Sequence, residues 1–374
     1  MKYPVLDLGA VNAPLMPAIS AAIDEVVQSG RYVGGPVVEA FEEELAAATG
    51  TPRAVGVSNG LDAMRLIFKA YIELGRLSPG DAVIVPANTY VASFLAITDA
   101  GLRPVPVEPD AVTLNMDTTL LEAAYTPDVK AVLTVHLYGR ACYDAALRDF
   151  VGRHNLLLVE DNAQAIGADG DVAGPLGTAR TGALGHAAAF SFYPTKNVGA
   201  LGDAGAVTSA DTDLLDAVRA LANYGSRERY NNIYKGYNCR LDPVQAAVLR
   251  VKLAALPAIT AARRRNAAAY QAAIDNEAVT KPLMTAPDRC VWHQYVVRVS
   301  DRAMFRNYLA ANGVGTDVHY PVPPHRQKCY AEYSALRLPV TERLADTVVS
   351  LPISEALTPA QIGEISRIIN SYRP

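Results

Sequence analysis

Residues 191–205 read SFYPTKNVGALGDAG, and this stretch places one lysine, Lys196, among apolar and glycine residues. Burial without a charged partner lowers the pKa of a lysine, because the ammonium form loses its solvation. A lysine that is partly neutral is a nucleophile that can form an imine with an aldehyde. Most lysines are solvated surface charges. The stretch therefore predicts a site for pyridoxal phosphate (PLP) only if the chain supplies the other groups that this cofactor needs.

A carboxylate for the pyridine nitrogen of PLP follows a predicted buried strand. Residues 156–159 are a continuous apolar run, typical of a strand covered on both faces of a parallel sheet. Asp161 comes just after this run, where the carboxyl ends of such strands open into a ligand crevice. Gln164 lies one turn further, within reach of the ring hydroxyl. The alternatives are that Asp161 caps the next helix and that Gln164 is a surface helix residue.

The turn Ser58-Asn59-Gly60 is the predicted phosphate cradle. It joins a short strand to a helix that begins near Leu61, so it presents a helix N-terminus with free N–H groups. Glycine also lets the backbone approach an anion closely. The lysine and hydroxyl of a P-loop are missing. Ser191 is a second candidate for the phosphate, unless it only ends its strand.

Tyr90 is the predicted stacking group, because an aromatic ring at the carboxyl end of a strand can lie on the pyridine face. A core position is the commoner case for a single tyrosine.

Strand candidates alternate with helical segments, which predicts an α/β fold with a mainly parallel seven-stranded sheet covered by helices on both faces. These candidates lie near residues 54–57, 83–86, 104–107, 131–136, 156–160, 187–192 and 205–208.

We expect a large cofactor-binding domain at 1–245, with an N-terminal arm, and a smaller α+β domain at 246–374. In the second half, we interpret 291–299 as a strand and Thr358-Pro359-Ala360-Gln361 as a helix start with a capping box. Residues 224–240 read as a loop, and a long helix begins at Pro243, with a break possible at Pro257. Arg263-Arg264-Arg265 is interpreted as a solvated helix face.

Composition argues against several other classes of protein. The chain has 374 residues, 50% hydrophobic and 19% charged, with a net charge of −4, so neither a nucleic-acid nor a membrane partner is expected. The start lacks the apolar core of a signal peptide, and no uninterrupted apolar run is long enough to span a bilayer. We therefore expect a cytoplasmic protein. The four cysteines show no paired spacing, so neither a metal site nor a disulfide framework is indicated.

Taken together, these segments resemble the DegT-type (DegT/DnrJ/StrS) sugar aminotransferases, which belong to the fold-type I PLP-dependent transferases. The resemblance runs nearly end to end. It is carried by the motifs SGRYVGGP (29–36), VSNGLDA (57–63), VPANTY (85–90), EDNAQ (160–164), SFYPTKN (191–197) and GYNCRLDPVQAA (236–247).

The resemblance implies roles for individual residues. Lys196 would be the Schiff-base lysine and proton shuttle, and Asp161 would pair with the pyridine nitrogen. The rest of PLP would be held by contacts with Gln164, Tyr90, Ser58, Asn59, Gly60, Leu61 and Ser191. Asn238 would reach the phosphate of the neighbouring subunit's cofactor, so a homodimer with shared active sites is expected. The family often has threonine in place of Leu61, which can offer only its backbone N–H, and often histidine in place of Tyr193.

The resemblance also implies a substrate class. L-glutamate would convert PLP to pyridoxamine phosphate, and a nucleotide-linked ketosugar would take the amine. The segments around Tyr193, Tyr230, His319, Tyr320 and His325 look most like those of enzymes that aminate C3 of a dTDP-3-keto-6-deoxyhexose. They would then contact the substrate, although by spacing alone 317–325 reads better as a structural turn.

Three alternatives remain open from the residues. The first is amination at C4 of a UDP- or dTDP-linked 4-keto-6-deoxy sugar. The second is a PLP-dependent sugar dehydratase, although those relatives carry histidine where this chain has Lys196. The third is a non-catalytic PLP-binding sensor, against which the complete set of Asp161, Gln164 and Lys196 argues.

Overall fold

Seven strands form the central sheet, in the order β1-β7-β6-β5-β4-β2-β3. The computed structural model describes residues 1–284, 286 and 289–374. Strands β2 to β6 run parallel, whereas β7 is antiparallel to both of its neighbours. The predicted mainly parallel sheet is therefore confirmed. Its strands are β1 Arg53–Val57, β2 Ala82–Pro86, β3 Arg103–Val107, β4 Val129–Val135, β5 Leu157–Asp161, β6 Ala187–Ser191 and β7 Gly205–Ser209.

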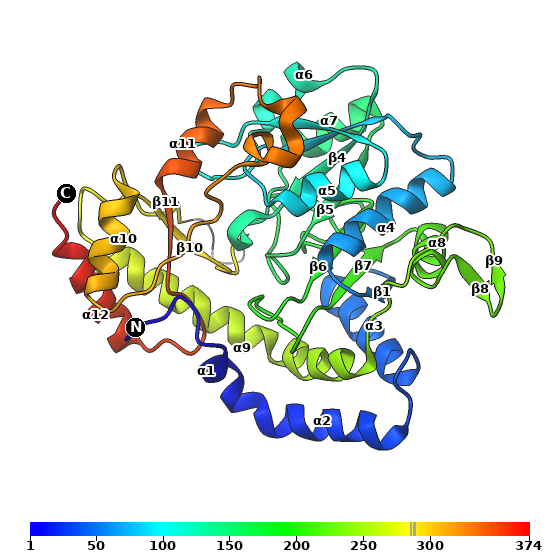
Figure 1. Ribbon diagram of the computed structural model, residues 1–374, viewed down its shortest axis with the longest axis horizontal. Coiled ribbons are helices and arrows are strands. Elements are labelled where there is room, and N and C mark those ends of the chain that lie inside the picture. The colour runs from blue at the N-terminus through cyan, green and yellow to red at the C-terminus, as the bar shows by residue number, and fades with distance from the viewer. Residues whose placement is uncertain (285, 287–288) are drawn as a thin grey trace.

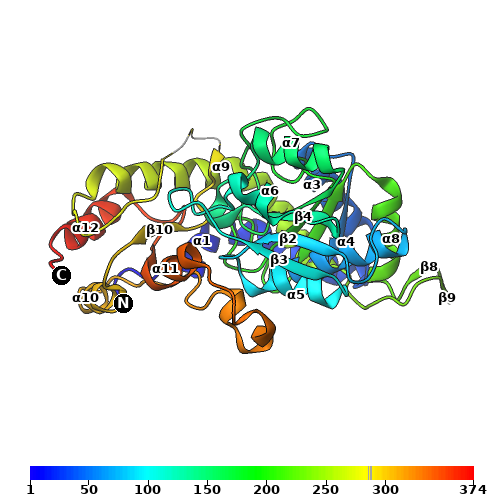
Figure 2. The same ribbon diagram turned by 90° about the horizontal axis from the view of Figure 1, so that it is seen from above.

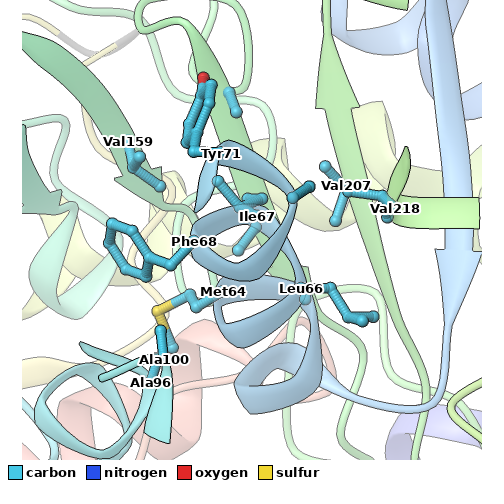
Figure 3. Packing of buried hydrophobic residues seen from close by; sticks show 14 of the residues in the cluster. Met64, Leu66, Ile67, Phe68, Tyr71, Ala96, Ala100, Val159, Val207 and Val218 are labelled. Carbon is cyan, nitrogen blue, oxygen red and sulfur yellow. The ribbon is translucent and has the colours of Figure 1, made fainter. Parts of the chain in front are cut away.

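Helices cover both faces of this sheet, because successive strand residues point to opposite sides. Val55 and Val57 of β1 pack in a cluster with α4, α5 and α8, and Figure 3 shows α4 side chains such as Ile67 and Phe68 packed there. Ala54, which directly precedes Val55, packs with α3 and α9 on the other face. These helices and two small ones are α3 Pro36–Thr49, α4 Gly60–Glu73, α5 Val91–Asp99, α6 Leu121–Ala124, α7 Ala145–His154, α8 Thr212–Ala222 and α9 Pro243–Ala273.

A second hydrophobic cluster forms the C-terminal part of the molecule around a two-stranded sheet. Helix α9 runs from the large sheet to this cluster, with α2 alongside it, as Figures 1 and 2 show. Ala246 to Leu256 of α9 pack with α3, whereas Tyr270 packs in the C-terminal cluster together with Tyr3. The division at 245 stays a prediction. The remaining elements are α1 Leu8–Asn12, α2 Met16–Ser29, β10 Tyr295–Arg298, α10 Arg302–Ala311, α11 Pro339–Thr347, β11 Val348–Leu351 and α12 Pro359–Asn370.

Local signals at helix ends agree with the structure. Helix α12 begins after Thr358 with a capping box, in which the Thr358 hydroxyl and the Gln361 side chain each accept a backbone N–H of the other residue. Helix α9 continues through Pro257, so the helix does not break there.

Three expectations are corrected by the structure. Only Tyr295–Arg298 of the predicted strand 291–299 is extended, because Trp292 adopts a left-handed backbone with φ 51°. Residues 224–240 contain a hairpin, β8 Ser226–Glu228 and β9 Asn231–Asn232, which projects from the body of the molecule in both views (Figures 1 and 2).

The third correction concerns Arg263, which is 2% exposed and not part of a solvated face. Its Nε lies 2.9 Å from Glu355, and its Nη1 donates to the carbonyl of Trp292 at 3.2 Å.

Residues Leu8–Ser29 and helix α9 are each long and apolar enough to cross a membrane by length and composition alone. Half of the α9 window is buried inside the protein, but only 11% of the Leu8–Ser29 window is.

Candidate active site

Lys196 and Asp161 come together at the carboxyl ends of two adjacent strands. Asp161 ends β5 and Lys196 lies in the turn that follows β6. Burial lowers the pKa of Lys196 to about 8, and the nearby Asp161 carboxylate opposes this shift. Lys196 is therefore neutral more often near physiological pH than an ordinary lysine, and the neutral amine is the form that attacks a carbonyl.

Asp161 is almost fully buried, with 6% of its surface exposed. Burial raises its pKa, whereas its hydrogen bonds and the charge of Lys196 lower it. Its Oδ2 accepts from the Ser93 hydroxyl at 2.8 Å and its Oδ1 from the backbone N–H of Ala163 at 3.2 Å. Asp161 caps no helix, because the residues after it form turns, so the alternative of a helix cap does not apply.

Gln164 joins two tyrosines next to this carboxylate. Its Oε1 accepts from the backbone N–H of Tyr138 at 2.6 Å, and its Nε2 donates to the Tyr320 hydroxyl at 3.0 Å. The rings of Tyr320 and Tyr90 lie 4.9 Å apart at an interplanar angle of 35°. Tyr90 is half exposed, so its ring is not a core position and is accessible to a ligand. The structure thus brings Gln164, Tyr90 and Tyr320 together beside Asp161.

The turn before α4 meets the end of β6. A Cβ atom on Gly60 would lie 2.6 Å from the Cβ atom of Ser191, so the two backbones touch because residue 60 is glycine. The first N–H groups of a helix have no partner within it, and at α4 Asn59 caps only that of Asp62, at 2.8 Å. The N–H groups of Gly60 and Leu61 and the Ser191 hydroxyl therefore share one edge of the site.

The side chains of Ser58 and Asn59 are engaged in the turn itself. The Ser58 hydroxyl and the Asn59 amide both donate to Oδ2 of Asp62, the latter at 2.9 Å. These two side chains shape the cradle, and the backbone of the turn offers the donors that an anion could use.

The residues predicted to contact a substrate divide into three groups. His319 bonds Ser350 at 2.8 Å through its Nδ1 and borders a small cavity with Tyr320. Tyr193 is half exposed in the lysine turn. Tyr230, between β8 and β9, is 86% exposed, and this hairpin projects from the body of the molecule (Figure 1).

The prediction for His325 is wrong. His325 is 1% exposed, and its Nε2 lies 3.2 Å from Glu342, so the side chain is buried and not accessible to a substrate. Asn238, by contrast, is exposed beside Cys239, whose carbonyl accepts from Ser58 N–H at 3.0 Å. Asn238 therefore lies at the outer side of the cradle turn, where a second molecule could meet it.

Sequence reasoning missed Ser93 and Thr89, whose hydroxyls lie 2.8 Å apart behind Asp161. It also missed Tyr138, which holds Gln164. Ser93 is one turn into a helix and Tyr138 follows a strand, and neither position has a sequence pattern of its own. Only the packing of α5 and β4 against β5 brings them to the site.

The chain's residues fit PLP. A lysine with a lowered pKa, a buried carboxylate, a half-exposed tyrosine ring and the N-terminus of α4 match the aldehyde, pyridine nitrogen, ring and phosphate of this cofactor.

Comparison with known proteins gives a consistent result. The model of the DegT/DnrJ/EryC1/StrS aminotransferase family matches residues 15–370. A dTDP-3-amino-3,6-dideoxy-alpha-D-galactopyranose transaminase from Aneurinibacillus thermoaerophilus is 43% identical over 99% of both chains.

Two solved structures share the fold over nearly the whole chain. Streptomyces venezuelae DesV, solved in complex with a ketimine intermediate, has a TM-score of 0.92 and 43% identity, covering 99% of this chain and 98% of that one. Bacillus subtilis NtdA, solved with bound cofactor PMP, has a TM-score of 0.88 and 28% identity, covering 99% and 86%. The chain belongs to the DegT/DnrJ/EryC1/StrS aminotransferase family.

Proposed function

We propose that this aminotransferase uses PLP to move the amino group of L-glutamate to C3 of a dTDP-linked 3-keto-6-deoxyhexose. The observation that carries the proposal is the placement of a partly neutral Lys196 beside the buried Asp161 carboxylate. The cofactor is supported by this fit and by NtdA, which was solved with PMP. The sugar class is supported by the A. thermoaerophilus transaminase, whose product carries its amine at C3.

Each residue has a separate task in this proposal. When bound, PLP supplies an electron sink for the carbon that loses a proton. Asp161 keeps the pyridine nitrogen protonated, and Gln164 orients the ring hydroxyl. Lys196 would hold the cofactor through its amine and, as a free amine, would accept and return a proton as a general base and acid. Tyr90 covers one face of the ring.

The phosphate would rest on the N–H groups of Gly60 and Leu61 and on the Ser191 hydroxyl, where the positive end of the α4 dipole favours an anion. Tyr193, which is half exposed, and His319 and Tyr320, which border one small cavity, would contact the sugar nucleotide.

A homodimer with shared sites is part of the proposal. Tyr230 and Ile233 of the projecting hairpin are exposed apolar side chains, 86% and 44% accessible, as expected of a segment that packs on a partner. Asn238 would reach the phosphate in the neighbouring subunit, and Tyr230 its substrate. A cytoplasmic location stays a prediction.

The test is a direct product analysis. The purified protein with PLP and glutamate is given a dTDP-linked 3-keto-6-deoxyhexose and its 4-keto isomer, and the products are identified by NMR. We expect amine only at C3, with one 2-oxoglutarate released per aminated sugar. The variant Lys196→Ala should form no product and should lose the visible absorbance of bound PLP.

The alternatives predict different outcomes. Amine at C4 would support the 4-keto assignment and contradict ours. Binding of PLP without turnover of either sugar would indicate a sensor. Loss of a sugar hydroxyl as water, without transfer of the amine, would indicate a dehydratase.

A further inference from the structure

Two buried hydroxyls form a chain behind Asp161. Ser93 of α5 is fully buried, and its Oγ donates to Oδ2 of Asp161 at 2.8 Å. Thr89, which is 1% exposed, has its Oγ1 2.8 Å from the same Ser93 Oγ. Neither hydroxyl has a place in the roles that we assign to the substrate or the cofactor.

The direction of these bonds follows from the number of protons available. A carboxylate can only accept, and the Ser93 hydroxyl has one proton, so this proton points to Asp161. Ser93 can then only accept from Thr89. The sequence of donors is Thr89 to Ser93 to Asp161, and each bond polarises the next one in a surround of low dielectric.

Packing alone gives no reason for a serine at this position. The neighbouring residues of α5, Phe94, Ala96 and Ile97, are fully buried in an apolar cluster. Serine forms helix less readily than alanine, and a buried hydroxyl is unfavourable unless it is bonded. The bond to Asp161 satisfies the Ser93 hydroxyl, and it also stabilises the charged form of a carboxylate that burial would otherwise neutralise.

We infer that Ser93, supported by Thr89, is a positioning residue that keeps the Asp161 carboxylate charged and aimed at the pyridine nitrogen of the cofactor. The inference rests on the proposed role of Asp161. Ser93 bonds Oδ2 and the Ala163 N–H bonds Oδ1, and each carboxylate oxygen has two lone pairs, so the carboxylate can also accept from the pyridine N–H without breaking the chain.

The test uses cofactor binding and spectra as well as turnover. In Ser93→Ala we expect the dissociation constant of PLP to rise by about tenfold, because a hydrogen bond to a charged group is lost. The acid limb of PLP binding should move to higher pH, since Asp161 then protonates more easily. Thr89→Val should move both quantities the same way by about threefold, because the donor to Asp161 remains. Thr89→Ser keeps the hydroxyl and should behave as the unaltered protein.

Thr98→Val is the matched control. Thr98 lies five residues further along the same helix, where its hydroxyl bonds the carbonyl of Phe94 at 3.1 Å and lies 3.0 Å from the Tyr330 hydroxyl. This variant can lose stability, but its PLP affinity and the acid limb of binding should not change. If Ser93→Ala likewise changes only the melting temperature, the inference is wrong.

A double variant separates this inference from the proposed function. With Asp161→Asn already in place, Ser93→Ala should have no further effect on PLP affinity. An equal effect in both backgrounds would show that Ser93 acts by packing and would overturn the inference. If Asp161→Asn by itself leaves PLP affinity unchanged, the assignment of Asp161 fails, whatever Ser93→Ala does.

Discussion

Burial lowers the pKa of the Lys196 amine, which favours reaction with a cofactor aldehyde but destabilises the cofactor-free protein. We expect Lys196→Met to stabilise the cofactor-free protein at pH 7 by about 1–2 kcal/mol, because it removes an ammonium group whose folded pKa is depressed. Above pH 8 the folded chain releases this proton before the unfolded chain does. The gain should therefore shrink as pH rises from about 8 to 10.5.

Urea unfolding of the cofactor-free protein at pH 7 and pH 10 measures this effect. Lys328→Met, at an exposed lysine outside the site and the hairpin, is the control and should leave the unfolding midpoint unchanged. A gain at Lys196 that is the same at both pH values would mean that the methionine acts through packing and not through charge.

Arginines close together in the sequence can contribute differently to the free energy of unfolding, and Arg263 is an example. Arg263→Ala should lower the free energy of unfolding by about 3–5 kcal/mol, because it leaves Glu355 without its partner in a buried network with the carbonyl of Trp292. Arg265→Ala, two positions along the helix at an exposed site, should change it by less than about 0.5 kcal/mol. Equal effects in denaturant unfolding would contradict the buried network.

At the scale of elements, the close approach of α4 to β6 determines the geometry of the predicted phosphate-binding turn. Gly60→Ala would place a Cβ 2.6 Å from that of Ser191 and 3.2 Å from its Cα, so the strand end must move. We expect a loss of about 1–3 kcal/mol in stability and weaker binding of PLP, because the helix N–H groups and the Ser191 hydroxyl are pushed apart.

Gly363→Ala, in the middle of α12, is the matched control. No atom lies within 4 Å of its added Cβ, so alanine should be neutral or stabilise the helix by up to about 1 kcal/mol. PLP titration and thermal unfolding of both variants measure the effect. Unchanged PLP affinity in Gly60→Ala would argue against a phosphate at this turn.

At the scale of the whole molecule, the shared site can be tested by mixing two inactive chains. Lys196→Ala subunits and Asn238→Ala subunits should each have little activity alone. In a mixed dimer, one site carries both changes and the other carries neither. After unfolding and refolding of an equal mixture, about a quarter of the original activity should return, since half of the dimers are mixed and each has one intact site. No recovery would mean that each site is built from one chain.

Much of this protein could be predicted before its structure, for reasons that lie in short-range chemistry. Apolar runs such as 156–159 must be buried on both sides, so the strands and the mainly parallel character of their sheet follow from the pattern, although the antiparallel pairing of β7 does not. The carboxyl ends of such strands form one edge, which brings Asp161 and Lys196 together although 34 residues separate them. The resemblance to the family motifs then assigned an expected role to each of these residues.

Only the tertiary structure decided the contacts that depend on packing between distant elements. The Ser93 and Thr89 hydroxyls behind Asp161, the engagement of Ser58 by Asp62 and the enclosure of His325 by Glu342 have no local signature. The same holds for Arg263, which by sequence looks like part of a charged helix face. It is buried because α9 packs against two hydrophobic clusters along its length. Periodicity states which residues are buried, but which polar groups meet inside depends on how the elements are assembled.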